Sequence, residues 1–459
     1  MNKQRAKTFL FISFICGCFL SAGTTGKLTG TIKSKVDDGP LIGANIIIEN
    51  TDLGTSTDLN GYYVILNIAP GKYNVTIRMI GYEVKKYENI RISIDKTTRL
   101  SSALDIEAVK GQEVVVSATR PLIDFDKTNS EAIVTSEELA IMPIEDVADV
   151  IKLQGGVTQD AGGGIHIRGG RSSEVAYLVD GVSVTDAYDG AIAVNIENAN
   201  IQELQVISGT FNAEYGKAMS GIVNIVTKDG GDKFESYLQV YSGDHQSDDN
   251  IYKNLNSYTL TNDKNITINL SGPIIKQKLN FFISARSYVS DGWLNGLQTF
   301  TMYGDTVHID NNLNGYFDST DVKKEPYYRA MNWRDKYSVQ TKLTYKLNPK
   351  LVLRLNSIIS NERWQNYNHN SQMAQEGQNT NYAGGNFTGL KLSQSFSSKT
   401  FYDININQSV HEYNAYLYKD PLDSKYITPD HLFWRNVSGA ITPDLSENYG
   451  TGLNFFPGK

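Results

Sequence analysis

The second half of the chain, from residue 234 onward, alternates apolar and polar residues with a regular period of two. Ile266, Ile268 and Leu270 alternate with polar neighbours, and the same period recurs at 279–286, 339–347 and 351–356. A period of two indicates β-strands that have one apolar and one polar face. Strands of this kind occur both in soluble sandwiches, which bury the apolar face, and in membrane-spanning barrels.

The lengths of the connections favour a barrel. Short connections at 276–278, 348–350 and 397–399 alternate with long polar stretches at 290–334 and 362–386. Short turns at one end and long loops at the other are typical of outer-membrane barrels, whose closed ladder satisfies every backbone group in lipid.

We therefore predict a mainly β chain in which residues 234–459 form antiparallel transmembrane β-barrel strands. The sequence shows about seven or eight such strands where plugged transporters use roughly 22. No final alternating strand precedes Lys459. We therefore expect a partial barrel, which is the N-terminal part of the barrel of a longer protein.

The first 23 residues have the layout of a secretory signal peptide. Basic residues precede an apolar run at 8–20, which is too short to span a bilayer, and small residues follow at 21–23. Both cysteines, Cys16 and Cys18, lie inside this segment, so the mature chain is expected to lack disulfides, thiol nucleophiles and cysteine metal ligands. A lipoprotein cleavage site at these cysteines is the alternative interpretation.

Residues 27–104 contain short strand patterns separated by turn residues, which predicts a small antiparallel β-sandwich. The segments Pro40-Leu41-Ile42-Gly43-Ala44, Asn60-Gly61-Tyr62-Tyr63 and Pro70-Gly71-Lys72-Tyr73 resemble the carboxypeptidase-regulatory-like domain. Because turns account for the glycines and prolines of these motifs, we expect no catalysis from this domain.

Composition and motifs exclude several function classes. A formal net charge of −7 argues against a nucleic-acid binder. The triplet Gly162-Gly163-Gly164 lacks the Lys-Ser/Thr of a phosphate-binding loop, and the sequence has no His-Glu-x-x-His metalloprotease motif and no Gly-x-Ser-x-Gly hydrolase motif. We therefore expect that the chain is not an enzyme.

An ordered set of motifs fills residues 124–231. Helical spacing from Ser136 to Leu153 precedes the strand Ile165-His166-Ile167-Arg168-Gly169-Gly170-Arg171. Asp180-Gly181 between two apolar runs predicts a two-residue hairpin, and Gly221-Ile222-Val223-Asn224-Ile225-Val226-Thr227-Lys228 closes the set. In this order the motifs resemble the plug domain of TonB-dependent outer-membrane receptors.

The resemblance implies ligand uptake across the outer membrane, with energy supplied through TonB and its inner-membrane complex. It places the barrel among outer-membrane lipids and the N-terminal domain in the periplasm. It leaves the ligand open among small molecules, siderophores, glycans and peptides. Two alternatives remain: an adhesion or surface protein on the same scaffold, and a glycan importer with a lipoprotein partner, which the stretch 217–221 fits less well.

The segment 111–120, between the two N-terminal domains, is an extended β-branched run. It is either a core strand or a strand that is available to a partner's sheet. In the family, the extended segment before the plug is the TonB box. The resemblance therefore makes this run the TonB-binding candidate, with the residues Glu113, Val114, Val115, Val116, Ser117 and Ala118.

Two arginines beside the paired glycines, Arg168 and Arg171, are candidates for holding the plug. In a soluble protein they would be solvated. Inside a plugged barrel a planar guanidinium group would face the polar wall and pair with its carboxylates. We therefore predict that these arginines anchor the plug rather than bind ligand.

The long stretch at 290–334 contains a candidate calcium loop. Oxygen-bearing residues occupy the EF-hand ligand positions with a glycine at position six: Asp310, Asn312, Asn314, Tyr316 (through its carbonyl), Asp318 and Asp321. The last position is Asp rather than Glu, and no helical pattern flanks the loop. The alternatives are a structural calcium ion and a solvated turn cluster.

Overall fold

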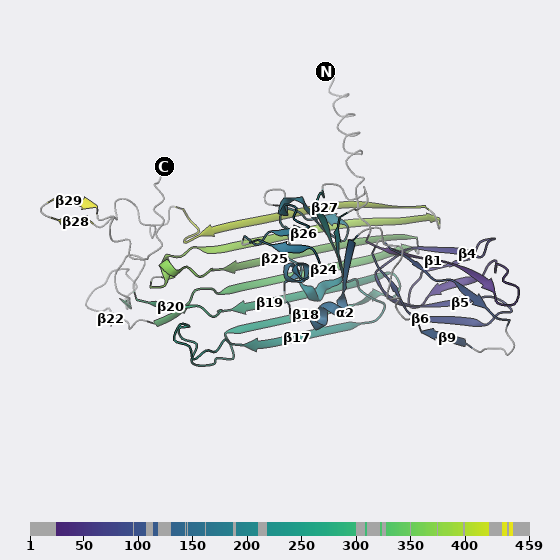
Figure 1. The fold of residues 1–459 in the computed structure, drawn as a ribbon, viewed down its shortest axis with the longest axis horizontal. Coiled ribbons are helices and arrows are strands. Elements are labelled where there is room, and N and C mark those ends of the chain that lie inside the picture. Colours follow the sequence, from purple (N-terminus) through teal and green to yellow (C-terminus); the bar gives the residue numbers. More distant parts are fainter. Residues whose placement is uncertain are drawn as a thin grey trace, which may run out of the picture.

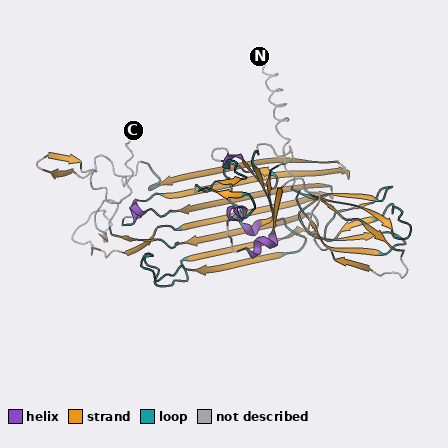
Figure 2. Ribbon diagram, viewed as in Figure 1, coloured by secondary structure: helices purple, strands orange, loops and turns teal. Residues whose placement is uncertain are grey.

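The protein is described here from a computed structural model. The described residues are 24–94, 96–106, 113–117, 130–142, 144, 146–160, 162–186, 190–209, 218–299, 308–309, 322–323, 327–348, 350–373, 375–397, 400–421, 434–437 and 440–443. They form an N-terminal β-domain, a small α+β domain and a long sheet, which Figure 1 shows in that order along the colour gradient. Strands dominate, as Figure 2 shows. The described residues contain two short α-helices and several 3₁₀ turns.

The N-terminal domain consists of two sheets. In the first sheet β1 (Gly26–Ser34) pairs with β4 (Tyr62–Ile68), β7 (Thr97–Arg99) and β8 (Ser102–Leu104). The second sheet has the order β3-β2-β5-β6-β9, with bounds Gly54–Ser56, Asn45–Ile48, Gly71–Arg78, Val84–Ile92 and Glu113–Ser117.

The expectation of a purely antiparallel sandwich at 27–104 is wrong for two strands, because β7 and β8 run parallel to β1. Beyond that range, β9 also runs parallel to its neighbour, β6. Each of these strands reaches its partner after a longer path through the domain, and only a strand that follows its neighbour directly through a tight hairpin has to be antiparallel.

Between the two sheets lies a closed apolar core. Leu28, Ile32, Ile46 and Ile77 are fully buried. The Tyr63 ring is buried with them, and its hydroxyl donates a hydrogen bond to the Leu100 carbonyl at 2.7 Å. The domain therefore has a core of its own, in which the buried Tyr63 hydroxyl is satisfied.

The plug, residues 130–227 of the described chain, is built on a five-stranded sheet of order β10-β15-β16-β13-β14. The strand bounds are Ser130–Thr135, Ile201–Ser208, Gly221–Thr227, Val175–Val179 and Val182–Ser183. Two short helices, α2 (Ser136–Ile141) and α3 (Val147–Lys152), pack against it. A small hairpin of β11 (Val157–Gln159) and β12 (Ile165–Ile167) projects from it.

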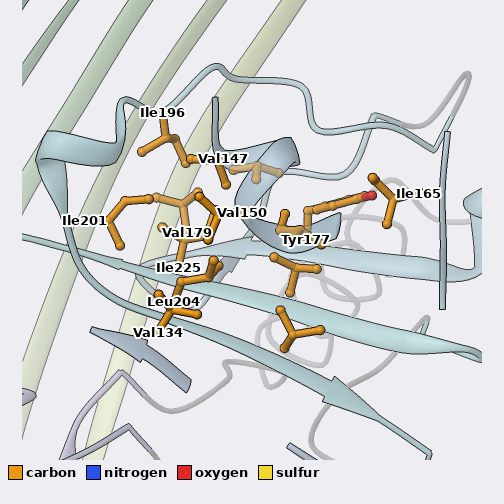
Figure 3. Packing of buried hydrophobic residues seen from close by; sticks show 14 of the residues in the cluster. Val134, Val147, Val150, Ile165, Tyr177, Val179, Ile196, Ile201, Leu204 and Ile225 are labelled. Carbon is orange, nitrogen blue, oxygen red and sulfur yellow. The ribbon is translucent and has the colours of Figure 1, made fainter. Parts of the chain in front are cut away.

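Local sequence explains these elements. Thr135 caps α2 in a capping box, because its hydroxyl accepts from the Glu138 amide and the Glu138 carboxylate accepts from the Thr135 amide. Apolar residues of the helices and strands meet in one cluster, in which Val150, Val179 and Leu204 are labelled in Figure 3. The predicted hairpin is confirmed: Asp180 and Gly181 have φ angles of 49° and 80°, as a tight turn between paired strands requires.

The third part is a sheet of seven antiparallel strands, each paired with the next along the chain. The strands are β17 (Glu235–Gly243), β18 (Asp263–Ile275), β19 (Leu279–Ser290), β24 (Arg334–Asn348), β25 (Leu351–Trp364), β26 (Thr380–Ser397) and β27 (Thr400–Tyr416). In the central strands one face is apolar and exposed, whereas the other is mostly polar and covered by the plug; the edge strands β17 and β27 are exposed along most of their length. Along β18, Ile266 and Ile268 are 43% and 42% exposed, while Thr267 between them is 2% exposed. This pattern is the inverse of a soluble fold and is that of a barrel wall.

The connections define two ends of the sheet. At the turn end, strands join within a few residues, at 275–279, 348–351 and 397–400, as predicted. At the loop end, the predicted loop 362–386 is too long: β25 runs to Trp364 and β26 begins at Thr380, in continuous register. Polar residues remain in the ladder there because backbone pairing, and not side-chain polarity, determines where a strand ends.

Smaller hairpins complete the described chain. They are formed by β20 (Asn295–Gln298) with β23 (Tyr327–Ala330), β21 (His308–Ile309) with β22 (Val322–Lys323), and β28 (Trp434–Val437) with β29 (Ala440–Pro443). Among the described residues, no helix is long and apolar enough to cross a bilayer.

Candidate functional site

The candidate site is the interface between the plug and the polar face of the seven-stranded sheet, which is called the wall below. Figure 1 shows the plug lying across the middle of this sheet. Two wall side chains, Ile358 and Phe387, are buried in the plug core itself, at 2% and 1% exposure. The remaining contacts are mostly polar and fall into two groups of charges.

The first group surrounds Glu197, a plug residue next to the short 3₁₀ helix Asn198–Asn200. Its carboxylate receives a guanidinium N–H of Arg286 and, at 2.8 Å, the hydroxyl of Ser338, and it lies 3.3 Å from the Lys336 ammonium. The same ammonium lies 3.2 Å from Asp146 of the plug. This group is called the Glu197 cluster.

Glu197 keeps its charge although it is 2% exposed. Burial alone would raise the pKa of its carboxyl, but Lys336 and Arg286 beside it hold the pKa below its usual value. The buried carboxylate is well satisfied, because two cations and a hydroxyl contact it. These contacts from the wall hold Glu197, and with it the plug, against the sheet.

The second group surrounds Lys342 of β24 and is called the Lys342 cluster. Its ammonium lies 3.2 Å from Asp180 and 3.1 Å from Asp229, and it donates to the Thr227 carbonyl at 3.1 Å. Asp180 also accepts from the Thr227 amide at 3.0 Å.

Neighbouring wall residues complete the Lys342 cluster. The side-chain amide of Asn356 donates to Asp180 at 2.7 Å, and Arg354 lies 3.6 Å from Asp229. Asp180 is the first residue of the plug hairpin turn. The turn between β13 and β14 therefore also supplies a carboxylate that contacts the wall.

In both clusters the carboxylates come from the plug or its connection to the sheet, and the cations come from the wall. Neither set was predicted from the sequence. A usable signal was present, because Arg286, Lys342 and Arg354 occupy polar positions of alternating strands. A cation on the inner face of a barrel needs a counter-charge, which in this structure is supplied by the plug.

The two arginines predicted to anchor the plug have exposed side chains. Arg168 has a φ of 50°, and its guanidinium lies against the backbone of Gly209, which is also in the plug. Arg171 precedes a 3₁₀ turn, and its amide donates to Glu174 at 3.1 Å. Their role as anchors stays a prediction, while the plug–wall contacts described above come from other residues.

Two cavities flank the interface. One of about 670 Å³ lies toward the loop end, between plug residues such as Asp160 and Tyr177 and the wall residues Arg334, Glu362 and Trp364. The other, of about 450 Å³, lies at the turn end and is lined by the N-terminal domain, the plug and the wall. The plug therefore separates a space at one end of the sheet from a space at the other.

The N-terminal domain is docked on the plug through its β6–β7 connection. The Ile94 amide donates to the Glu203 carboxylate at 3.0 Å, and Lys96 lies 3.2 Å from Glu131. Burial raises the pKa of Glu203 to about 7, against the opposing effect of the Ile94 hydrogen bond. Closer to α2, Lys72 lies 2.9 Å from Glu137 and, through this hydrogen bond, lowers the pKa of that carboxyl to about 2.

The same domain also touches the turn end of the wall. Asp52 lies 3.3 Å from the Lys346 ammonium, and the Asn67 side-chain amide donates to the Ser395 hydroxyl at 2.9 Å. Together with the cavity at this end, these contacts place the N-terminal domain beside the turn-end opening of the space that the plug occupies.

The segment predicted to bind TonB is a strand. Glu113 to Ser117 form β9, which pairs in parallel register with β6 from Val84 to Glu88. Ala118, the last predicted residue of the segment, lies outside the described residues. Its use as a partner-binding strand stays a prediction.

The predicted calcium loop, Asp310 to Asp321, also lies outside the described residues. Across the part of the chain that is described, no group of three or more His, Cys, Asp or Glu residues is arranged to hold a metal.

Comparison with known families adds two matches. Residues 28–116 match the CarboxypepD_reg-like domain, and residues 124–223 match the TonB-dependent receptor plug domain. The second match covers the α+β domain that lies on the wall. The α+β domain is thus a TonB-dependent receptor plug domain, and the chain is similar to TonB-dependent receptors over a longer stretch.

Curated relatives carry the same family name. The TonB-dependent transporter Oar of Myxococcus xanthus is 26% identical over 64% of this chain and 29% of its own length. The TonB-dependent receptor P39 of Formosa agariphila is 31% identical over 50% and 22%. The TonB-dependent receptor SusC of Bacteroides thetaiotaomicron is 24% identical over 50% and 24%. The match to this chain thus spans less than a third of the length of each relative.

Among solved structures, the siderophore receptor PirA from Pseudomonas aeruginosa matches 62% of this chain and 41% of its own, at 16% identity and a TM-score of 0.42. The ferric-catecholate import receptor Fiu from E. coli K12 matches 63% and 39%, at 11% identity and a TM-score of 0.43.

Proposed function

We propose that this receptor takes up a ligand through the outer membrane, with energy supplied by TonB. The observation that carries the proposal is the plug on the wall: a folded domain obstructs the polar side of a sheet whose other side is apolar. An obstruction of this kind has to move before a solute passes, and the buried charges of the Glu197 and Lys342 clusters oppose that movement.

In this proposal the loop end faces outward and the turn end faces the periplasm, as short turns and long loops do in outer-membrane barrels. The cavity of about 670 Å³ at the loop end is then where a ligand arrives. Its lining combines carboxylates, cations and Trp364, which suits a polar ligand with an apolar or ring-shaped part. The N-terminal domain is then periplasmic, and β9 is within reach of TonB.

Energy-dependent movement of the plug is the test that separates transport from adhesion. Ala176, in β13, is 8% exposed, and the mature chain is expected to lack cysteine, so Ala176→Cys would give a single buried thiol. We expect a maleimide reagent to label this cysteine faster in energised cells that express the protein than in the same cells treated with a protonophore. Equal labelling would favour a surface protein that does not transport.

TonB binding is tested independently of the ligand. Val115→Pro removes an N–H from the middle of β9, whereas Val115→Thr keeps it and remains β-branched. We expect the purified C-terminal domain of the same bacterium's TonB to bind the Thr variant like the unmodified receptor and to bind the Pro variant at least tenfold more weakly. Equal binding of both variants would contradict the assignment of Glu113–Ala118.

A further inference from the structure

The TonB-binding candidate is not a loose tail but the edge strand of a folded domain. β9 is the last strand in the order β3-β2-β5-β6-β9, and in the described chain β6 is its one sheet neighbour. Figure 1 shows β9 at the lower border of the N-terminal domain. Five residue pairs, from Val84 with Glu113 to Glu88 with Ser117, are in register.

An edge strand presents half of its backbone groups to solvent. Successive residues of a strand direct their N–H and C=O groups to opposite neighbours, so alternate residues of β9 bond to β6 and the others point outward. Such a row of free donors and acceptors is a template for a strand from another chain.

The chain is tied down where it approaches β9. Tyr82 and Ile106 form a β-bridge, and the Glu83 amide donates to the Asp105 carbonyl at 3.0 Å. In return, the Asp105 amide donates to the Glu83 carboxylate at 3.2 Å, and the Asp105 carboxylate lies 2.9 Å from the Lys35 ammonium. The CarboxypepD_reg-like match extends to residue 116, so most of β9 also belongs to the domain by sequence.

We propose that TonB adds a strand to the outer edge of β9 while β9 stays paired with β6, so that the two proteins share one continuous sheet. The proposal rests on the proposed function, which assigns Glu113–Ala118 to TonB. Strand addition keeps the β6–β9 ladder and uses the backbone groups of β9 that point away from β6, whereas release of β9 would first break that ladder. A pull from TonB then acts on the whole N-terminal domain. It therefore also acts on the contacts of this domain with Glu203 of the plug and Lys346 of the wall.

A disulfide staple across β6 and β9 tests this directly. Lys86 and Val115 are register partners, and Cα atoms of paired neighbours lie within the range that a disulfide spans. In the full-length receptor with Lys86→Cys and Val115→Cys, we expect the oxidised and reduced forms to bind the purified TonB C-terminal domain with Kd values within threefold of each other. Loss of binding by tenfold or more on oxidation, restored by dithiothreitol, would show that β9 has to leave β6 and would overturn the proposal.

The matched control is a staple at the opposite edge of the same sheet. Asn45 and Ser56 are register partners of β2 and β3, so the pair Asn45→Cys and Ser56→Cys leaves β9 untouched. We expect this receptor to bind TonB equally in both redox states. If the unmodified receptor does not bind TonB at all, the assignment of the TonB box fails and this proposal fails with it.

Hydrogen exchange gives a second readout that needs no substitution. On adding the TonB domain we expect amides of β9 to gain protection while the amides of residues 84–88 in β6 keep theirs. A tenfold or larger loss of protection in β6 would mean that β9 has been stripped from the sheet, which contradicts the proposal.

Discussion

Replacing Lys342 with methionine should loosen the plug by about 3 kcal/mol. The Lys342 side chain is 4% exposed and lies 3.2 and 3.1 Å from two carboxylates. Removing one partner of a buried ion pair costs about 3–5 kcal/mol, because the other charge stays buried. The lower end applies here, since Asp180 keeps its bonds from Thr227 and Asn356 and Asp229 keeps Arg354. Methionine preserves most of the side-chain volume, so the loss is electrostatic.

The assay measures how often the plug opens. In the background of Ala176→Cys, the rate of maleimide labelling in moderate urea reports the fraction of molecules whose plug core is exposed. A loss of about 3 kcal/mol should raise this rate by roughly 150-fold. The matched control is Lys346→Met on the same strand: its side chain is 23% exposed and contacts Asp52 at 3.3 Å, so a change of less than about 1 kcal/mol, or fivefold, is expected.

A double-mutant cycle identifies the interaction. Asp229→Asn removes one of the two carboxylates that Lys342 faces, so its effect should be strongly non-additive with that of Lys342→Met. A labelling rate for Lys342→Met within threefold of the parent, or additive effects in the cycle, would refute the view that this cluster holds the plug.

Three further predictions concern the domain contact, the exposed arginines and the calcium loop. The pKa of Glu203 is raised from 4.5 to about 7, so docking of the N-terminal domain on the plug should be strongest below about pH 4.5 and weaken as the pH rises through 7. A spin-label distance across the interface would measure docking, and Glu203→Gln should abolish its pH dependence. Arg168→Ala should lower the protease resistance of the plug, and unchanged resistance and channel leakage would remove its anchoring role. Calorimetry of the receptor should show calcium binding near 10⁻⁴ to 10⁻³ M that Asp310→Ala abolishes, and identical heats from both proteins would exclude the site.

Structural features that depend on short stretches of sequence were predictable. The period of two after residue 234 located the wall strands, and Asp180-Gly181 located the plug hairpin, because alternation and turn chemistry depend on near neighbours in sequence. The parallel pairing of β7 and β8 with β1 was missed, since it depends on the path of the chain through the whole domain.

The site was harder to predict than the fold. Its ion pairs join residues that are far apart in the chain, such as Asp180 and Lys342 or Glu197 and Arg286. The sequence drew attention to Arg168 and Arg171 because they stand beside glycines. The buried cations of the wall are set among ordinary polar strand residues, and only the seated plug reveals their partners.

The division of charge between plug and wall has a consequence for permeation. Glu197 and Asp180 belong to the plug, whereas Arg286, Lys336 and Lys342 are fixed on the strands. If the plug leaves the wall, as the proposed transport requires, these cations lose their neutralising partners, and the face that the plug vacates becomes more positive, most of all at low ionic strength. That face would then attract acidic solutes more strongly than basic ones. In the proposed transport, this preference would therefore arise when the plug moves and would be absent while the plug is in place.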